Sequence, residues 1–133
     1  MITTRIIDEQ HKQDINIKNE PFRIWGRMIP SYIDEKWDYR IEKFHEEKIE
    51  EDCFPDEDYD YDAMKKEYFF VGAYDGEDCV GVALLRRHYF KYLYLDDLKV
   101  SKAYRGQKIG HLLIDHCKKV AKENGYRGVY TIG

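Results

Sequence analysis

The stretch Tyr104-Arg105-Gly106-Gln107-Lys108-Ile109-Gly110-His111 (YRGQKIGH) lies between a strand-like run and a helix-like run. The first amides of a helix lack an intrahelical partner, and with the helix dipole they attract anions. We assign those amides to the residues from Gly106 through Gly110. The two glycines leave room for a close approach, Arg105 offers a forked donor to phosphate oxygens, and Lys108 adds a point charge. The turn therefore predicts a diphosphate site.

The spacing of the glycines restricts the kind of site. The stretch matches neither GxGxxG nor GxxxxGK[ST], which disfavours a dinucleotide fold and a P-loop. Two glycines that serve only a tight strand-to-helix connection explain the turn equally well. Lys108 adds its cation if its φ is helical, whereas a positive φ would strain the backbone.

The sequence before the turn predicts three antiparallel strands. Residues 68–74 are rich in strand formers, and Asp75-Gly76 is a tight-hairpin signal because glycine accepts a positive φ. The returning strand covers residues 79–85. A short connection from His88 to Lys91 leads to a third strand, Tyr92 to Val100.

The sequence after the turn predicts a helix and a final strand. Six apolar residues recur at helical spacing: Ile109, Leu112, Leu113, Cys117, Val120 and Ala121. Gly125 is placed as a C-terminal cap, and residues 128–132 form a short strand. Strand, helix and strand make a crossover unit in which the two strands run parallel.

The first half of the chain is less regular. Residues 22–30 alternate apolar and polar side chains, which predicts a half-buried strand that Pro30 ends or marks as an edge. Residues 34–49 are ambiguous, with a weakly helical spacing of Trp37, Ile41, Phe44 and Lys48. The acidic stretch from Glu50 to Asp62 is either a solvated loop or a wall that attracts a cationic ligand.

Composition limits the class of protein. A chain of 133 residues allows about one domain, which we assign to residues 1–133. A net charge of −4 argues against a nucleic-acid partner and tolerates a cationic small molecule. No apolar run is long enough to span a membrane, and the polar N-terminus lacks a signal-peptide core, so we expect a cytoplasmic protein. The three cysteines and five histidines lack ligand spacing, so no metal is expected.

The strand and turn together resemble a known motif. Leu95-Asp96-Asp97-Leu98-Lys99-Val100, a four-residue gap and then Arg105 to Gly110 are similar to motif A of the GNAT superfamily of acetyl-CoA-dependent N-acetyltransferases. Arg105 and Gly110 match, and Lys108 stands where a glycine is usual. Pro21-Phe22, Gly26-Arg27, Ile29-Pro30-Ser31-Tyr32, Asp96-Asp97 and Ala121-Lys122-Glu123-Asn124 resemble streptothricin acetyltransferases, which acetylate an amine of a cationic antibiotic and so confer resistance.

The resemblance implies an α+β (α/β) fold, with a mixed, mostly antiparallel sheet and a βαβ cofactor unit. It implies acetyl-CoA as cosubstrate, with the diphosphate on Arg105, Gly106, Gln107, Lys108, Ile109 and Gly110. The pantetheine arm would pair with the backbone of Leu98, Lys99 and Val100, and the Leu98 amide would stabilise the oxyanion.

The acceptor implied by the resemblance is a small cationic amine. Asp96 or Asp97 would bind its ammonium and act as base; because strand side chains alternate, we expect only one of the two to face it. Tyr32 is a candidate for substrate binding.

GNAT domains continue after the strand that corresponds to residues 128–132 with another helix and two strands. We therefore expect a C-terminally truncated domain. Its exposed last strand would then favour a homodimer or a completing chain. The alternatives to an active enzyme are a non-catalytic acyl-CoA-binding remnant and an interaction protein that uses its open edge strand.

Overall fold

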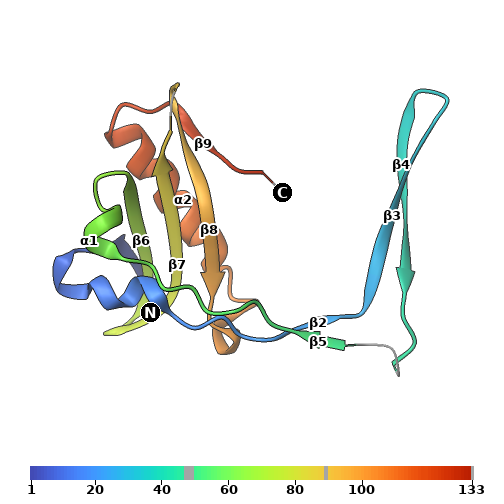
Figure 1. The fold of residues 1–133 in the computed structure, drawn as a ribbon, viewed down its shortest axis with the longest axis horizontal. Coiled ribbons are helices and arrows are strands. Elements are labelled where there is room, and N and C mark those ends of the chain that lie inside the picture. Colours follow the sequence, from blue (N-terminus) through green and yellow to red (C-terminus); the bar gives the residue numbers. More distant parts are fainter. Residues whose placement is uncertain (47–49, 89, 133) are drawn as a thin grey trace. The chain divides into compact units, whose positions relative to one another are not determined.

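The computed structural model describes residues 1–46, 50–88 and 90–132 (Figure 1). The chain forms two compact units. The first comprises Met1–Asn19 and Asp56–Gly133, and the second comprises Glu20–Pro55.

The first unit is built on a five-stranded sheet with the order β1-β6-β7-β8-β9. Its strands are β1 (Ile2–Ile6), β6 (Tyr68–Asp75), β7 (Asp78–Arg87), β8 (Tyr92–Val100) and β9 (Gly128–Tyr130). Neighbouring strands are antiparallel except β8 and β9, which are parallel. The predicted mixed, mostly antiparallel sheet is therefore confirmed, and β9 lies at its edge.

The predicted hairpin and crossover are also confirmed. Gly76 has φ 62° in the turn between β6 and β7, which is the conformation that the Asp-Gly signal requires. The helix α2 (Ile109–Glu123) joins β8 to β9. It ends in a Schellman motif, in which Gly125 has φ 82° and the amide of Tyr126 donates to the carbonyl of Ala121 at 2.8 Å.

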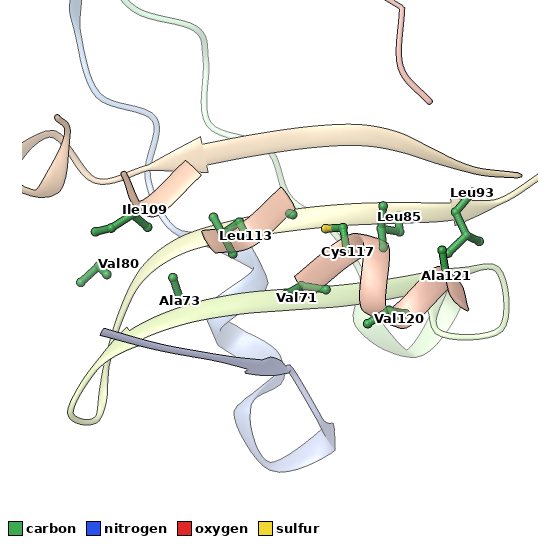
Figure 2. Close-up of a cluster of buried hydrophobic side chains, with 11 residues drawn as sticks. Val71, Ala73, Val80, Leu85, Leu93, Ile109, Leu113, Cys117, Val120 and Ala121 are labelled. Atoms are coloured by element: carbon green, nitrogen blue, oxygen red, sulfur yellow. The ribbon is translucent and has the colours of Figure 1, made fainter. Parts of the chain in front are cut away.

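One face of the sheet is covered by α2, whose apolar side lies over β6, β7 and β8 (Figure 2). Five of the six apolar positions predicted for this helix are buried: Ile109, Leu113, Cys117, Val120 and Ala121. Leu112 is 41% exposed, because it lies at the margin of the apolar stripe. This packing fixes the start of α2 at the end of β8.

The opposite face of the sheet carries a second core. It contains Ile7, Ile15, Phe70, Tyr74, Val82 and Leu84. The 3-10 helix η1 (Glu9–Asn16) and the short helix α1 (Tyr61–Met64) pack on this side. β1 and η1 are absent from the sequence prediction, since the strand is short and η1 has no regular apolar stripe.

The second unit contains two pairs of antiparallel strands, β2 (Phe22–Ile24) with β5 (Glu50–Asp52) and β3 (Gly26–Ile33) with β4 (Lys36–Lys43). The single half-buried strand predicted for residues 22–30 is wrong in two respects. It is interrupted at Trp25, and β3 continues past Pro30 with mostly exposed side chains. Proline is tolerated there because both strands of a two-stranded ribbon are edges.

Residues 36–43 form the strand β4, where the sequence left a helix open. Asp34 and Glu35 adopt φ values of 52° and 60° and form the two-residue connection between β3 and β4. Such turns usually contain glycine or asparagine, so the signal is missing from the sequence. Lys48, the last residue of the predicted spacing, and Ile49, the end of the ambiguous segment, lie outside the described residues. Within the described residues, no helix is both long and apolar enough to cross a membrane.

Candidate active site

A cleft of about 340 Å³ surrounds the turn between β8 and α2. Its lining residues are Val100, Tyr104, Arg105, Gly106, Lys108, Ile109, Gly110 and His111. Gln107 was predicted for this site but is not among the lining residues; its side-chain amide donates to the carbonyl of Ala103 at 3.5 Å. The structure therefore brings most of the predicted turn residues to one cavity.

The free amides at the start of α2 belong to residues slightly later in the chain than predicted. The helix begins at Ile109, and the amide of Leu112 donates to the carbonyl of Lys108 at 3.1 Å. The first-turn amides without an intrahelical partner are then those of Ile109, Gly110 and His111. Gly106 lies in the preceding loop, so the assignment from Gly106 through Gly110 starts too early. His111 was missed, although the apolar spacing that begins at Ile109 carried the signal.

Lys108 has a left-handed backbone, with φ 63° and ψ 22°, at the N-cap of α2. Of the two alternatives for Lys108, a helical φ or a positive φ that strains the backbone, the structure shows the second. A Cβ atom built on Gly106 or Gly110 would meet nothing within 4 Å. Both glycines thus leave open space at the cleft and are not needed for packing inside the protein.

Arg105 lies across the end of β8. Its Nε donates to the carbonyl of Val100 at 3.3 Å, and its side chain is exposed. The guanidinium is therefore held beside the first turn of α2, where it adds a cation to the helix N-terminus.

The edge of β8 next to β9 is open over its second half. Among the described residues, β9 pairs with β8 only from Tyr92 to Tyr94. The amide of Ser101 donates to Val80 of β7 at 2.8 Å, so by antiparallel alternation the backbone of Lys99 faces β7. The backbone groups of Leu98 and Val100 then face the open edge. Two of the three residues predicted for strand-like pairing present their backbone there, whereas Lys99 does not.

A β-bulge in β8 changes the direction of the two aspartates. Leu84 pairs with Asp97 and Leu85 pairs with Leu95, so Asp96 is an extra residue between them. Asp96 accepts a hydrogen bond from the Tyr68 hydroxyl at 2.7 Å, and Asp97 accepts one from Tyr59 at 2.9 Å.

Both tyrosines pack on the core opposite α2. Both carboxylates therefore lie on the same face. We expected strand alternation to let only one of the two aspartates face the acceptor. That expectation is wrong, because the bulge interrupts the alternation between Asp96 and Asp97.

Lys99 connects this face to the acidic stretch. Its Nζ lies 2.6 Å from Glu57 Oε2 and 3.8 Å from Asp97 Oδ2, and it donates to the carbonyl of Ile17 at 3.3 Å. The Lys99 side chain is only 10% exposed. At least one residue of the acidic stretch is therefore an internal ion-pair partner and not part of a solvated loop.

These contacts shift the pKa values of the groups involved. Burial raises the pKa of Glu57, but hydrogen bonds from Lys99 and Asn19 outweigh it, and the pKa lies below its usual range. Burial, followed by the hydrogen bond to Asp96, raises the pKa of Tyr68 to about 12. Burial and the hydrogen bond to Asp97 likewise raise the pKa of Tyr59. Both phenols therefore stay protonated as donors at neutral pH.

Comparison with known proteins agrees with this geometry. Residues 30–132 match the model of the acetyltransferase (GNAT) family. Streptothricin acetyltransferase A of Bacillus subtilis (strain 168) is 31% identical over 118 residues, which cover 88% of this chain and 67% of that protein. The chain belongs to the GNAT acetyltransferase family.

Solved structures show the same fold as this GNAT chain. A Bacillus anthracis str. Ames protein, assigned as a streptothricin acetyltransferase and solved with acetyl coenzyme A, gives a TM-score of 0.77 at 20% identity; the match covers 98% of this chain and 74% of that one. Nourseothricin acetyltransferase gives 0.72 at 16% identity, over 98% of this chain and 72% of that one. The expected fold and N-acetyltransferase class are thus confirmed.

The GNAT chain has a second cleft, of about 370 Å³, at the other end of β8. It is lined by His88, Phe90, Tyr92 and Tyr130. The Tyr130 hydroxyl and His88 Nδ1 are 2.5 Å apart, and the rings of Tyr130 and Tyr94 are 5.2 Å apart. Sequence reasoning missed this aromatic cleft, because Tyr130 lies far along the chain from the other three lining residues.

Tyr32 lies in β3 of the second unit. Its ring packs on Trp37 with centroids 4.9 Å apart, and it is 57% exposed. Its role in substrate binding stays a prediction.

Proposed function

We propose that this chain transfers the acetyl group of acetyl-CoA to a primary amine of a small cationic acceptor such as streptothricin. The observation that carries the proposal is the cleft at the start of α2, which adjoins the open edge of β8. The relationship to streptothricin acetyltransferase A supports the choice of acceptor.

The residues around the cleft fit a diphosphate. The amides of Ile109, Gly110 and His111 and the side chain of Arg105 would hold it, because helix N-termini and guanidinium groups both bind phosphate oxygens. Gly106 and Gly110 leave the space that the ligand needs. The left-handed backbone of Lys108 starts the helix at this point, and Lys108 is among the residues that line the cleft.

The open edge of β8 fits an extended amide-containing arm. Leu98 and Val100 would pair with it through their backbone groups, as an added strand does. When bound, acetyl-CoA supplies a thioester whose carbonyl carbon accepts the amine nitrogen as the C–S bond breaks. The Leu98 amide would donate to the carbonyl oxygen as negative charge develops on it.

The carboxylates on the face opposite α2 fit a cationic acceptor. An alkylammonium has a pKa of about 10.4 in water, so it must lose a proton before the nitrogen attacks. Asp96 and Asp97 are the carboxylates that β8 offers on this face for binding the ammonium. One proton of the amine goes through a carboxylate to solvent and a second ends on the thiol that leaves.

The cofactor part of the proposal is tested by thermal unfolding with acetyl-CoA. Ligand that binds only the native state at 100 times its Kd stabilises by about 2.7 kcal/mol, which raises Tm by several degrees in a chain of this size. No shift at millimolar acetyl-CoA would contradict the proposal and favour the interaction protein.

The transfer part is tested by following thiol release with streptothricin as acceptor. Acetylated product and one equivalent of free thiol are expected, and mass spectrometry of the product identifies the amine. Stabilisation by acetyl-CoA without thiol release would instead support an acyl-CoA-binding remnant.

A further inference from the structure

The two neighbouring aspartates on β8 have different surroundings although they share a face. Asp97 is 22% exposed, accepts the Tyr59 hydroxyl at 2.9 Å and lies 3.8 Å from the Lys99 ammonium. Asp96 is exposed, and within the described chain its hydrogen-bond partner is the Tyr68 hydroxyl at 2.7 Å. A charge that is already paired attracts an incoming cation less than one that is not. The two carboxylates are therefore not equivalent.

Lys99 is held from three directions. Its ammonium reaches Glu57 Oε2 at 2.6 Å, the Ile17 carbonyl at 3.3 Å and the Asp97 carboxylate at 3.8 Å. Asn19 also donates to Glu57 at 2.6 Å, so the partner of Lys99 is itself fixed. The side chain of Lys99 is thus committed to the protein interior and to Asp97.

The peptide unit between Asp97 and Leu98 carries the Leu98 amide. The side chains on either side of Leu98 are those of Asp97 and Lys99, and both are anchored on the face opposite α2. The Leu98 backbone faces the open edge of β8, as deduced above from the alternation with β7. Anchoring the residues before and after Leu98 fixes the direction of its amide.

Two charged groups, Arg86 and Glu67, act on Tyr68, whose hydroxyl donates to Asp96. Arg86 pairs in register with Tyr68 and Tyr94, and its Nη2 lies 3.8 Å from Glu67. Arg86 is therefore paired with Glu67 and not with Asp96. The Asp96 carboxylate stays accessible to a cation from solvent.

We propose a division of labour between the two aspartates, which rests on the proposed acetyl transfer. Asp96, oriented by Tyr68, receives the ammonium of the acceptor. Asp97 is a positioning residue: together with Lys99, Glu57 and Tyr59 it holds the Leu98 amide in the direction that polarises the thioester carbonyl.

Steady-state kinetics of Asp96→Asn and Asp97→Asn separate the two roles. Asp96→Asn raises the KM for streptothricin tenfold or more, because the ammonium loses its counter-charge. Asp97→Asn lowers kcat about tenfold and leaves that KM within about twofold, because the carbonyl is polarised less well. The reverse pattern, or the same change of KM in both variants, overturns the proposal.

The positioning network is tested by a second pair of variants. Glu57→Gln/Lys99→Met removes both members of the ion pair and leaves Asp97 with the Tyr59 hydroxyl as its partner. This double variant retains stabilisation by acetyl-CoA and loses kcat as Asp97→Asn does. Tyr59→Phe, which removes only the hydroxyl, lowers kcat by a smaller factor. Unchanged kcat in a folded double variant rules out the network as a positioning device.

Binding without turnover distinguishes this proposal from the proposed function. Isothermal titration of streptothricin into the chain without acetyl-CoA reports the ammonium site alone, and Asp96→Asn weakens this binding tenfold or more while Asp97→Asn does not. A wild-type chain that binds streptothricin in this manner but releases no thiol contradicts the acetyl transfer and retains the assignment of Asp96. Equal binding to both variants contradicts that assignment whether or not transfer occurs.

Discussion

The ammonium of Lys99 lies 2.6 Å from Oε2 of Glu57, and the two residues are 42 positions apart in the chain. This ion pair connects β8 to the acidic stretch. It also brings Tyr59, two residues further along, to within hydrogen-bonding distance of Asp97. A stretch that a sequence presents as solvated charge thus becomes part of the wall beside the candidate active site.

The Glu57–Lys99 pair makes the free energy of unfolding fall at acid pH. The pKa of Glu57 is lower in the folded chain than its model-compound value of 4.5, so the pair stabilises above that pH and the stabilisation is lost as pH falls through the folded pKa. Urea unfolding of the wild type and Glu57→Gln should differ at pH 7 and converge below about pH 4.5.

The double variant Glu57→Gln/Lys99→Met is the control, because its stability should show the same acid dependence as Glu57→Gln. If the difference in unfolding free energy between the wild type and Glu57→Gln stays constant from pH 7 to pH 3, the ion pair is contradicted.

Lys108→Gly should stabilise the chain. A left-handed backbone costs a non-glycine residue about 1–2 kcal/mol, and the greater freedom of glycine in the unfolded state offsets part of this. We expect a net gain of about 0.5–1 kcal/mol, measured as a higher urea midpoint.

Lys108→Ala is the matched control, since it removes the side chain and keeps the strain. Gly106→Ala should have the opposite sign, because Gly106 has φ 80°. Equal midpoints for Lys108→Gly and Lys108→Ala would exclude backbone strain as the cause.

Leu113→Ala and Leu112→Ala should differ in their effect although the residues are adjacent. Leu113 is fully buried between α2 and the sheet, so truncating it costs about 2–5 kcal/mol. Leu112 is 41% exposed, and its truncation should cost less than about 1 kcal/mol. Unfolding free energies of the two variants measure this contrast, and equal losses would mean that α2 packs with a different face.

Gly110→Ala should separate stability from ligand binding. Beyond the backbone of its own helix turn, the new Cβ meets no protein atom within 4 Å, and alanine is favoured over glycine in a helix by about 0.5–1 kcal/mol. The variant should therefore be at least as stable as the wild type and show a smaller rise in Tm with acetyl-CoA, because the methyl group enters the cleft. If acetyl-CoA raises the Tm of Gly110→Ala as much as that of the wild type, the diphosphate does not bind at the start of α2.

Much of the first unit is predictable from sequence because its signals are local. The hairpin follows from Asp75-Gly76, and α2 follows from an apolar spacing that ends at Gly125. The second unit is less predictable, since the turn at Asp34 and Glu35 adopts positive φ values without glycine or asparagine. The β3–β4 ribbon therefore gave no hairpin signal that a pattern could detect.

The sequence alone determined the turn, its glycines and its arginine, because the start of a helix and the need for space are written in adjacent residues. The directions of the Asp96 and Asp97 side chains, by contrast, depend on how the strands pair. A one-residue bulge is defined by the pairing of β8 with β7, and it turns Asp96 and Asp97 to the same side. The partner of Lys99 lies 42 residues away, so the contact exists only once the chain has folded and buried the ammonium. Strand alternation is a local rule, and the pairing of distant segments overrules it here.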